Sequence, residues 1–196
     1  MKNIVLASAS KRRARILEEC CIPHSIMVSG YLEEHFVGEK VWDIVAHNAT
    51  KKAELVAAET SNAVIIGADT LVAHDDDVIG KPSDEASAKG LLRKFSGSHI
   101  EVYTGICVID TAFGKKACGI DKSEIFVKTL AEEEVDKYFS LLGPYDKAGG
   151  FSIEGVGSMI FDDIRGSYFN ILGLPMIKLA QVFNDIGLEI SNYMRK

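Results

Sequence analysis

Several features that mark other protein classes are missing from this sequence of 196 residues. No hydrophobic stretch approaches the length of a transmembrane helix, which needs about 20 consecutive apolar residues. The apolar run at residues 3–7 ends at Ser8 and is too short for the core of a secretory signal peptide. Low-complexity segments, long linkers and internal repeats are also lacking. We therefore expect neither a membrane span nor a secretory leader.

Cysteine is scarce, and its spacing excludes the common zinc motifs. The four cysteines are Cys20, Cys21, Cys107 and Cys118, with no CxxC pair and no Cys/His ligand spacing. We expect buried, reduced thiols and, as the default that follows from them, a cytoplasmic location.

Positive charge is in deficit, because 22 Lys and Arg face 28 Asp and Glu, which gives a formal net charge of −6. A protein that binds nucleic acid broadly needs a basic face to neutralise phosphates, so we expect no nucleic-acid partner. A small anionic ligand remains compatible with this charge, because local clusters can outweigh the net value.

The length suits one domain or two tightly joined lobes, and hydrophobic periodicity predicts an α/β fold whose sheet is partly antiparallel. In the longest predicted helix, Trp42 and Val45 lie on one apolar stripe, and Ser83 can cap a later helix. Pro175 suits the first position of the last helix. The predicted strands are 3–7, 24–28, 63–68, 71–74, 78–79, 100–110, 124–129 and 159–164, and the predicted helices are 12–20, 41–59, 84–95, 131–142 and one that opens at Pro175.

A first chemical cluster begins where the first predicted strand ends, in the segment Leu6-Ala7-Ser8-Ala9-Ser10-Lys11-Arg12-Arg13. Three consecutive cations at the start of a helix oppose its macrodipole, so helix stability does not explain them. A bound phosphate does, because backbone N–H groups, hydroxyls and guanidinium groups can converge on it there. Ser8 or Ser10 can equally serve as a helix cap, and the arginines can simply be solvated.

A second cluster centres on Asp69, which ends an apolar strand, where α/β sheets usually present catalytic groups. A carboxylate there can hold Mg²⁺ and position or deprotonate a water, or it can form a loop hydrogen bond.

Helical phase places Lys51 opposite the apolar stripe and Lys52 at its margin, where it can lean toward a cleft or snorkel to solvent. Lys81 sits in a stiff turn, from which it can reach phosphate or remain solvated.

Two acidic positions complete the candidate site. Glu154 follows a glycine-rich stretch, DKAGGFSIEG at 146–155, and is placed to read a base. Such glycine clusters also occur in ordinary loops, and this one is neither a P-loop nor a dinucleotide fingerprint. Glu34 can add a metal ligand beside Asp69, or form a solvated pair with Glu33.

Taken in order, these segments resemble the Maf family of nucleotide pyrophosphatases. No single motif is decisive, but their order and spacing along nearly the whole chain are specific. They comprise LASASKRRARIL at 6–17, ATKKAE at 49–54, IIGADTLV at 65–72, IGKPSD at 79–84, LRKFSG at 92–97, YTG at 103–105, DKAGGFSIEG at 146–155 and GSYFNILGLP at 166–175.

The resemblance implies one Maf-like domain over residues 1–196, with two lobes, a mixed sheet and a central cleft, related to inosine triphosphatases. It implies hydrolysis of a nucleoside triphosphate to the monophosphate and pyrophosphate, with Mg²⁺ or Mn²⁺ as cofactor. It places the catalytic base on Asp69, which would lie close to the metal. The phosphate-binding groups that it implies are Ser8, Ser10, Arg12, Arg13, Lys52 and Lys81.

Base preference divides the family into a dTTP/UTP subgroup and a 7-methyl-GTP subgroup. Arg12 beside Arg13, together with Thr70, resembles the first subgroup, whereas Glu154 resembles the second. Ionised glutamate only accepts hydrogen bonds, so it suits N3–H of a pyrimidine but repels the neighbouring carbonyls, whereas it suits the donor edge of guanine. Lys11 also replaces the proline of the usual SPRR motif. Two features against one favour dTTP, UTP and modified pyrimidine nucleotides as substrates.

A function of another class is also open, because Maf proteins have been linked to inhibition of septum formation. A nucleotide-sensing regulator would need the binding groups but not the base, so Asp69 favours catalysis. The resemblance further suggests a homodimer.

Overall fold

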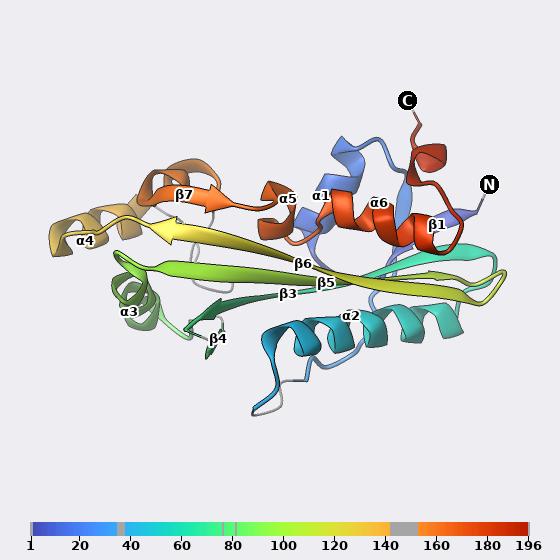
Figure 1. Ribbon diagram of the computed structural model, residues 1–196, viewed down its shortest axis with the longest axis horizontal. Coiled ribbons are helices and arrows are strands. Elements are labelled where there is room, and N and C mark those ends of the chain that lie inside the picture. Colours follow the sequence, from blue (N-terminus) through green and yellow to red (C-terminus); the bar gives the residue numbers. More distant parts are fainter. Residues whose placement is uncertain (1, 35–37, 76, 81, 142–152, 196) are drawn as a thin grey trace. The chain divides into compact units, whose positions relative to one another are not determined.

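The computed structural model describes residues 2–34, 38–75, 77–80, 82–141 and 153–195 (Figure 1). Its elements confirm an α/β fold. The strands are β1 (Asn3–Leu6), β2 (His24–Ile26), β3 (Ala63–His74), β4 (Asp77–Ile79), β5 (His99–Asp110), β6 (Lys115–Val127) and β7 (Phe161–Arg165). The helices are α1 (Lys11–Glu19), α2 (Val41–Ala58), α3 (Glu85–Phe95), α4 (Glu132–Leu141), α5 (Tyr168–Ile171) and α6 (Met176–Asp185), with short 3-10 turns η2 (Gly155–Ile160) and η3 (Ile190–Tyr193).

The described strands form one mixed sheet in the order β2-β1-β3-β5-β6-β7, with β4 paired to β3. β1 runs parallel to both β2 and β3, whereas the β3–β4 and β6–β7 pairs are antiparallel. The prediction of a partly antiparallel sheet is therefore confirmed.

The chain divides into two compact units. Unit 1 comprises Met1–Thr70, Tyr103–Asp121 and Ser167–Lys196, and unit 2 comprises Leu71–Val102 and Lys122–Gly166. Because β3, β5 and β6 each contain residues of both units, the units share strands rather than being joined by linkers. The assignment of residues 1–196 to one domain stays a prediction.

In unit 1, two glycines allow α2 to pack directly on the backbone of the sheet (Figure 1). A Cβ at Gly67 of β3 would lie 2.3 Å from the carbonyl oxygen of Ala49, and one at Gly105 of β5 would lie 2.3 Å from that of Val45. Any side chain at either position would push the helix away. This close approach brings the polar residues of α2 within hydrogen-bonding distance of β3.

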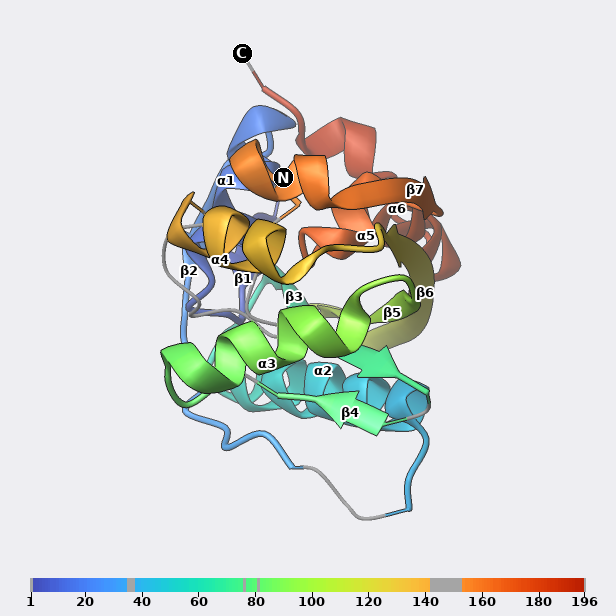
Figure 2. The ribbon, with the colours of Figure 1, turned by 90° about the vertical axis from the view of Figure 1, so that its left-hand side faces the viewer.

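Unit 2 packs α3 against α4, with β7 on the edge of β6 (Figure 2). Its ion pairs lie at the surface: Arg93 contacts Glu132, and Lys89 Nζ lies 3.0 Å from Asp136 Oδ1. Within the described residues of the whole chain, no helix combines the length and apolarity needed to cross a membrane.

Several local predictions are wrong. Asp84, not Ser83, caps α3, because the Asp84 side chain accepts from Ser87 N and the Ser87 hydroxyl accepts from Asp84 N. Trp42, in the first turn of α2, is 39% exposed rather than buried with the apolar stripe, and its ring centroid lies 6.1 Å from that of Tyr103. Pro175 precedes α6 as its N-cap rather than opening it.

The thiols also differ from expectation. Cys107 is buried, whereas Cys20 is only partly buried and both Cys21 and Cys118 are exposed. Cys118 belongs to a part of β6 that the sequence analysis left unassigned, because the strand begins at Lys115 rather than near residue 124.

Candidate active site

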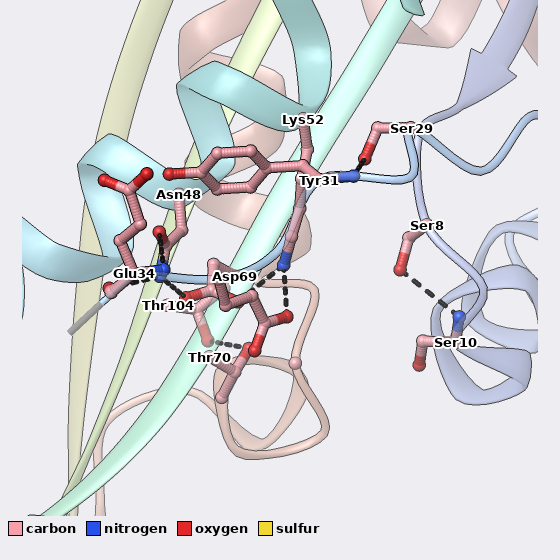
Figure 3. A network of polar contacts seen from close by, with 12 residues as sticks. Ser8, Ser10, Ser29, Tyr31, Glu34, Asn48, Lys52, Asp69, Thr70 and Thr104 are labelled. Carbon is pink, nitrogen blue, oxygen red and sulfur yellow. Dashed lines mark hydrogen bonds and ion pairs between the residues drawn. The ribbon is translucent and has the colours of Figure 1, made fainter. Parts of the chain in front are cut away.

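The site is built around the carboxylate of Asp69, which is 3% exposed on β3 (Figure 3). Its Oδ1 lies 2.7 Å from Lys52 Nζ, and its Oδ2 accepts a hydrogen bond from Asn48 Nδ2 at 3.0 Å. A buried carboxylate without partners would be strongly unfavourable, and these two contacts give each of its oxygens a partner. Both partners come from α2, one helical turn apart.

Lys52 holds a second carboxylate as well. Its Nζ lies 2.6 Å from Glu33 Oε1, so one buried ammonium is shared by Glu33 and Asp69. Burial opposes ionisation of Glu33, but the hydrogen bond and charge of Lys52, with smaller contributions from Asp69 and Arg13, together lower the pKa of this carboxyl. Of the two orientations that the sequence left open for Lys52, the structure shows the inward one, while Lys51 points outward and is 47% exposed.

Asn48 is a component of the site that sequence reasoning missed. It is fully buried, and besides Asp69 it binds the backbone of Glu34, donating to its carbonyl oxygen at 3.3 Å and accepting from its N–H at 3.2 Å. It therefore ties the segment of residues 29–34 to both α2 and β3. The available signal was a polar side chain within an apolar helical stripe, four residues before Lys52.

The structure places Glu33, rather than Glu34, beside Lys52 and Asp69. The Glu34 carboxylate is half-exposed, with Oε2 3.7 Å from His47 Nε2. Among the residues that the structure describes, no three or more His, Cys, Asp or Glu side chains form a group able to hold a metal ion. The two-carboxylate pair still fits Mg²⁺, which usually takes one or two protein carboxylates and completes its shell with waters and phosphate oxygens.

The two predicted serines form the turn between β1 and α1. Ser10 caps α1, its hydroxyl accepting from the backbone N–H of Arg13 at 3.4 Å. Ser8 Oγ accepts from Ser10 N at 3.2 Å and from Arg13 Nη1 at 2.9 Å. Arg12, the next residue of the motif, is only partly buried. The capping role left open by the sequence is thus real for Ser10, and Ser8 stabilises the same turn.

Arg13 points inward and starts a directed chain of hydrogen bonds. Its Nε donates to the carbonyl oxygen of Gly173 at 2.8 Å, and its Nη2 donates to Thr70 Oγ1 at 3.0 Å. Thr104 uses its single proton on the carbonyl oxygen of Asn170 at 3.2 Å, so Thr70 is the donor in the 2.9 Å Thr70–Thr104 contact. Burial lowers the pKa of Arg13, which nevertheless stays cationic at neutral pH.

Gly173 makes this arrangement possible. Its φ of +99° is unfavourable for other residues, and a Cβ there would lie 3.2 Å from Thr70 Oγ1. A side chain would therefore press on Thr70 and on the guanidinium of Arg13. The loop after α5 thus has to carry glycine for Arg13 to reach its carbonyl oxygen.

The remaining predicted residues are not brought into this group. Lys81 lies outside the described residues. Glu154 belongs to unit 2, where it is partly buried and precedes η2. In unit 1 the structure brings together Ser8, Ser10, Arg13 and Thr70 on one side, and Lys52 and Asp69 on the other, with Thr70 following Asp69 directly. The catalytic and binding roles of all these residues stay predictions.

Comparison with known proteins gives a consistent result. A family model described as "Maf-like protein" matches residues 3–186. The dTTP/UTP pyrophosphatase of Dictyoglomus thermophilum is 37% identical over 191 residues, which is 96% of this chain and 98% of that protein. The dTTP/UTP pyrophosphatase of Bacillus cereus (strain Q1) is 38% identical over 192 residues, or 98% of this chain and 100% of that protein. The Ham1 protein structure from Staphylococcus aureus matches with a TM-score of 0.46 at 15% identity, over 68% of this chain and 88% of that one.

Proposed function

This chain belongs to the Maf-like protein family, and we propose that it hydrolyses dTTP and UTP to the nucleoside monophosphate and pyrophosphate. The observation that supports the reaction is the buried Asp69 carboxylate, fixed by Lys52 and Asn48 at the end of unit 1's portion of β3. Support for the two pyrimidine substrates comes from the names of near-full-length relatives at 37% and 38% identity.

Asp69 is the group that orients and deprotonates the attacking water. Each of its oxygens already accepts one hydrogen bond, and each has a further lone pair with which to accept from water. Because Lys52 and Asn48 fix the carboxylate before substrate binds, little reorganisation is needed during the reaction. The proton of the water passes to an oxygen of Asp69 as the oxygen of the water attacks phosphorus.

Positive charge is also needed beside the departing pyrophosphate, because negative charge accumulates on this leaving group during cleavage. Arg12, the partly buried cation at the start of α1, is our candidate for direct phosphate contact together with Lys81. Arg13 has at least three of its five N–H groups donated within the protein, so we assign it chiefly to fixing Ser8 and Thr70.

A divalent cation, Mg²⁺ or Mn²⁺, suits the oxygen ligands that Asp69 and Glu33 offer. Such an ion, when bound, neutralises charge on phosphate oxygens. Glu33 is better placed for this role than Glu34, because Glu33 shares Lys52 with Asp69. Until the ion binds, Lys52 offsets the repulsion between the two carboxylates.

The proposed preference for pyrimidines has one alternative, a preference for 7-methyl-GTP, and this alternative rests on Glu154. A glutamate can accept from both donors of a guanine-like edge, so its presence favours 7-methyl-GTP. Thr70, the opposing indicator, has its own proton committed to Thr104 and offers a base only an acceptor lone pair. The names of the near-full-length relatives support the pyrimidines.

The test is pyrophosphate release by the purified protein from dTTP, UTP, CTP, ITP and 7-methyl-GTP in the presence of Mg²⁺. We expect activity concentrated on dTTP and UTP. Activity concentrated on 7-methyl-GTP would show that Glu154 determines the base and would overturn the substrate proposal. Nucleotide binding without turnover of any substrate would favour the regulatory alternative.

A further inference from the structure

Cys107 and Cys118 form a thiol pair that the proposed reaction does not use. They lie on the adjacent strands β5 and β6, within unit 1, and their Sγ atoms are 2.9 Å apart. A disulfide bond measures about 2.05 Å, so a shift of roughly 1 Å would join the two sulfur atoms. The other two cysteines, Cys20 and Cys21, follow α1 elsewhere in the unit.

The two thiols differ sharply in access. Cys107 has no exposed surface and belongs to the core cluster that includes Ala53 of α2 and Ile65 of β3. Cys118 is exposed on the neighbouring strand, with its Sγ 3.5 Å from Thr50 Oγ1. A reagent in solution therefore meets Cys118 first, and Cys107 then lies within bonding reach of the modified sulfur.

The electrostatic surroundings make Cys118 the nucleophile of the pair. The hydrogen bond between the two thiols, with smaller contributions from Thr50 and the charge of Lys116, lowers the pKa of Cys118 to about 6, against burial and the charge of Glu54. The hydrogen bond with Cys118 and burial raise the pKa of Cys107. Of the two thiols, Cys118 is therefore the one that ionises more readily.

We propose that Cys107 and Cys118 are a reversible oxidation site, which takes a peroxide or a low-molecular-weight disulfide as its oxidant. The geometric basis is an exposed thiol on β6 whose Sγ lies 2.9 Å from a buried thiol on the adjacent strand β5. Because thiols of this kind stay reduced in a reducing compartment, the pair would change state only when oxidant is present.

The chemistry balances with a peroxide as the oxidant. The Cys118 thiolate attacks one peroxide oxygen, the O–O bond breaks, and Cys118 becomes a sulfenic acid while the other oxygen leaves as alkoxide or hydroxide and is protonated. The Cys107 sulfur then attacks the Cys118 sulfur, the S–O bond breaks, and the hydroxide leaves as water with the Cys107 proton. Two thiols and one peroxide thus give one disulfide, one alcohol or water, and one water.

The test is oxidation of the full-length reduced protein with hydrogen peroxide, followed by alkylation and mass spectrometry of the intact chain and its peptides. Of the four cysteines in the sequence, we expect Cys107 and Cys118 to lose their reactivity to the alkylating reagent together, with a mass loss of two hydrogens. Dithiothreitol should restore four alkylatable thiols under unfolding conditions.

Two variants make the test specific. Cys118→Ser, at an exposed position, should leave Cys107 reduced at the same peroxide dose, whereas Cys20→Ser with Cys21→Ser should leave the cross-link unchanged. Accumulation of sulfinic acid on Cys118 without a cross-link would overturn the proposal, as would a disulfide between two chains or one formed by Cys20 and Cys21. None of these readouts depends on pyrophosphatase activity, so the site is tested independently of the proposed function.

Discussion

The same kind of contact, a cation against a carboxylate, occurs in two very different settings in the two units. In unit 1, Lys52 and Asp69 are each less than a tenth exposed, and their contact also includes Glu33. In unit 2, Arg93 and Glu132 contact each other between α3 and α4 with side chains 44% and 64% exposed. Water can replace either partner of the exposed pair, but a buried charge that loses its partner stays uncompensated.

The comparison indicates that the buried charges of unit 1 serve the chemistry, whereas the ion pair of unit 2 is an ordinary surface contact. An isolated buried ion pair contributes little to net stability, because desolvation offsets its attraction. The grouping of one ammonium, from Lys52, with two carboxylates, from Glu33 and Asp69, is therefore better explained by function than by stability. Substitutions on the two sides should separate these roles.

Lys52→Met should have the largest effect. Removal of the ammonium leaves Glu33 and Asp69 facing each other, so we expect a loss of about 3 kcal/mol in the free energy of unfolding and at least a 100-fold fall in kcat/KM. Urea denaturation and pyrophosphate release measure the two effects. Lys51→Met, one position along the same helix, is the matched control, and equal behaviour of the two variants would contradict the model of the site.

Asn48→Leu should follow. The leucine fills a similar volume but leaves the N–H and carbonyl of Glu34, and one oxygen of Asp69, without their buried partner, at a cost of about 1–3 kcal/mol. Because the orientation of Asp69 is lost, kcat should fall about tenfold or more, with a smaller change in KM. Asn184→Leu, at an exposed position of α6, controls for the change of residue type. Unchanged kcat in Asn48→Leu would remove Asn48 from the site.

Glu33→Gln should change how the stability of the protein depends on pH. The pKa of Glu33 is lowered in the folded protein, so its ionised form contributes stability that is present above its unfolded pKa of about 4.5 and is lost as pH falls through the lower, folded value. As pH falls from about 5 to about 3, wild-type stability should therefore fall more steeply than that of Glu33→Gln, as followed by thermal unfolding. Glu59→Gln, at the exposed end of α2, should match the wild type; identical slopes for all three proteins would argue against the Lys52–Glu33 contact.

Arg93→Ala should have the smallest effect, because its contact with Glu132 lies at the surface. We expect a shift in Tm of no more than about 2 °C and unchanged turnover of dTTP. Differential scanning calorimetry and the pyrophosphate assay check both. A loss of activity comparable to that of Lys52→Met would contradict the distinction between a functional ion pair in unit 1 and a surface ion pair without a catalytic role in unit 2.

Much of this arrangement could be predicted from the sequence, and the reasons are local. The sequence singled out Asp69 as a functional residue, although β3 continues to His74, so Asp69 lies within the strand rather than at its end as predicted. Helical phase placed Lys52 at the margin of the apolar stripe, from which it reaches Asp69. The order of motifs predicted the Maf family, which the match over residues 3–186 confirms. These inferences succeed because they depend on periodicity and on residue types that lie close together in the chain.

What the sequence did not reveal depends on contacts between distant segments. Asn48 and Glu33 join the site only because Gly67 and Gly105 let α2 lie against the sheet, which no local pattern expresses. Glu33 and Glu34 are adjacent acidic residues, and only the path of the chain decides which one reaches Lys52. The pairing of Cys107 with Cys118 likewise depends on how β5 and β6 align.

The most direct test of the account is the turnover and nucleotide affinity of Asp69→Asn, measured side by side with Mg²⁺ and dTTP. Asparagine keeps the size of the side chain but cannot take the proton of the attacking water, so we predict that nucleotide binding is retained while kcat falls at least about 100-fold. Turnover close to that of the wild type, with the substitution verified and binding intact, would contradict the assignment of Asp69 as the catalytic base.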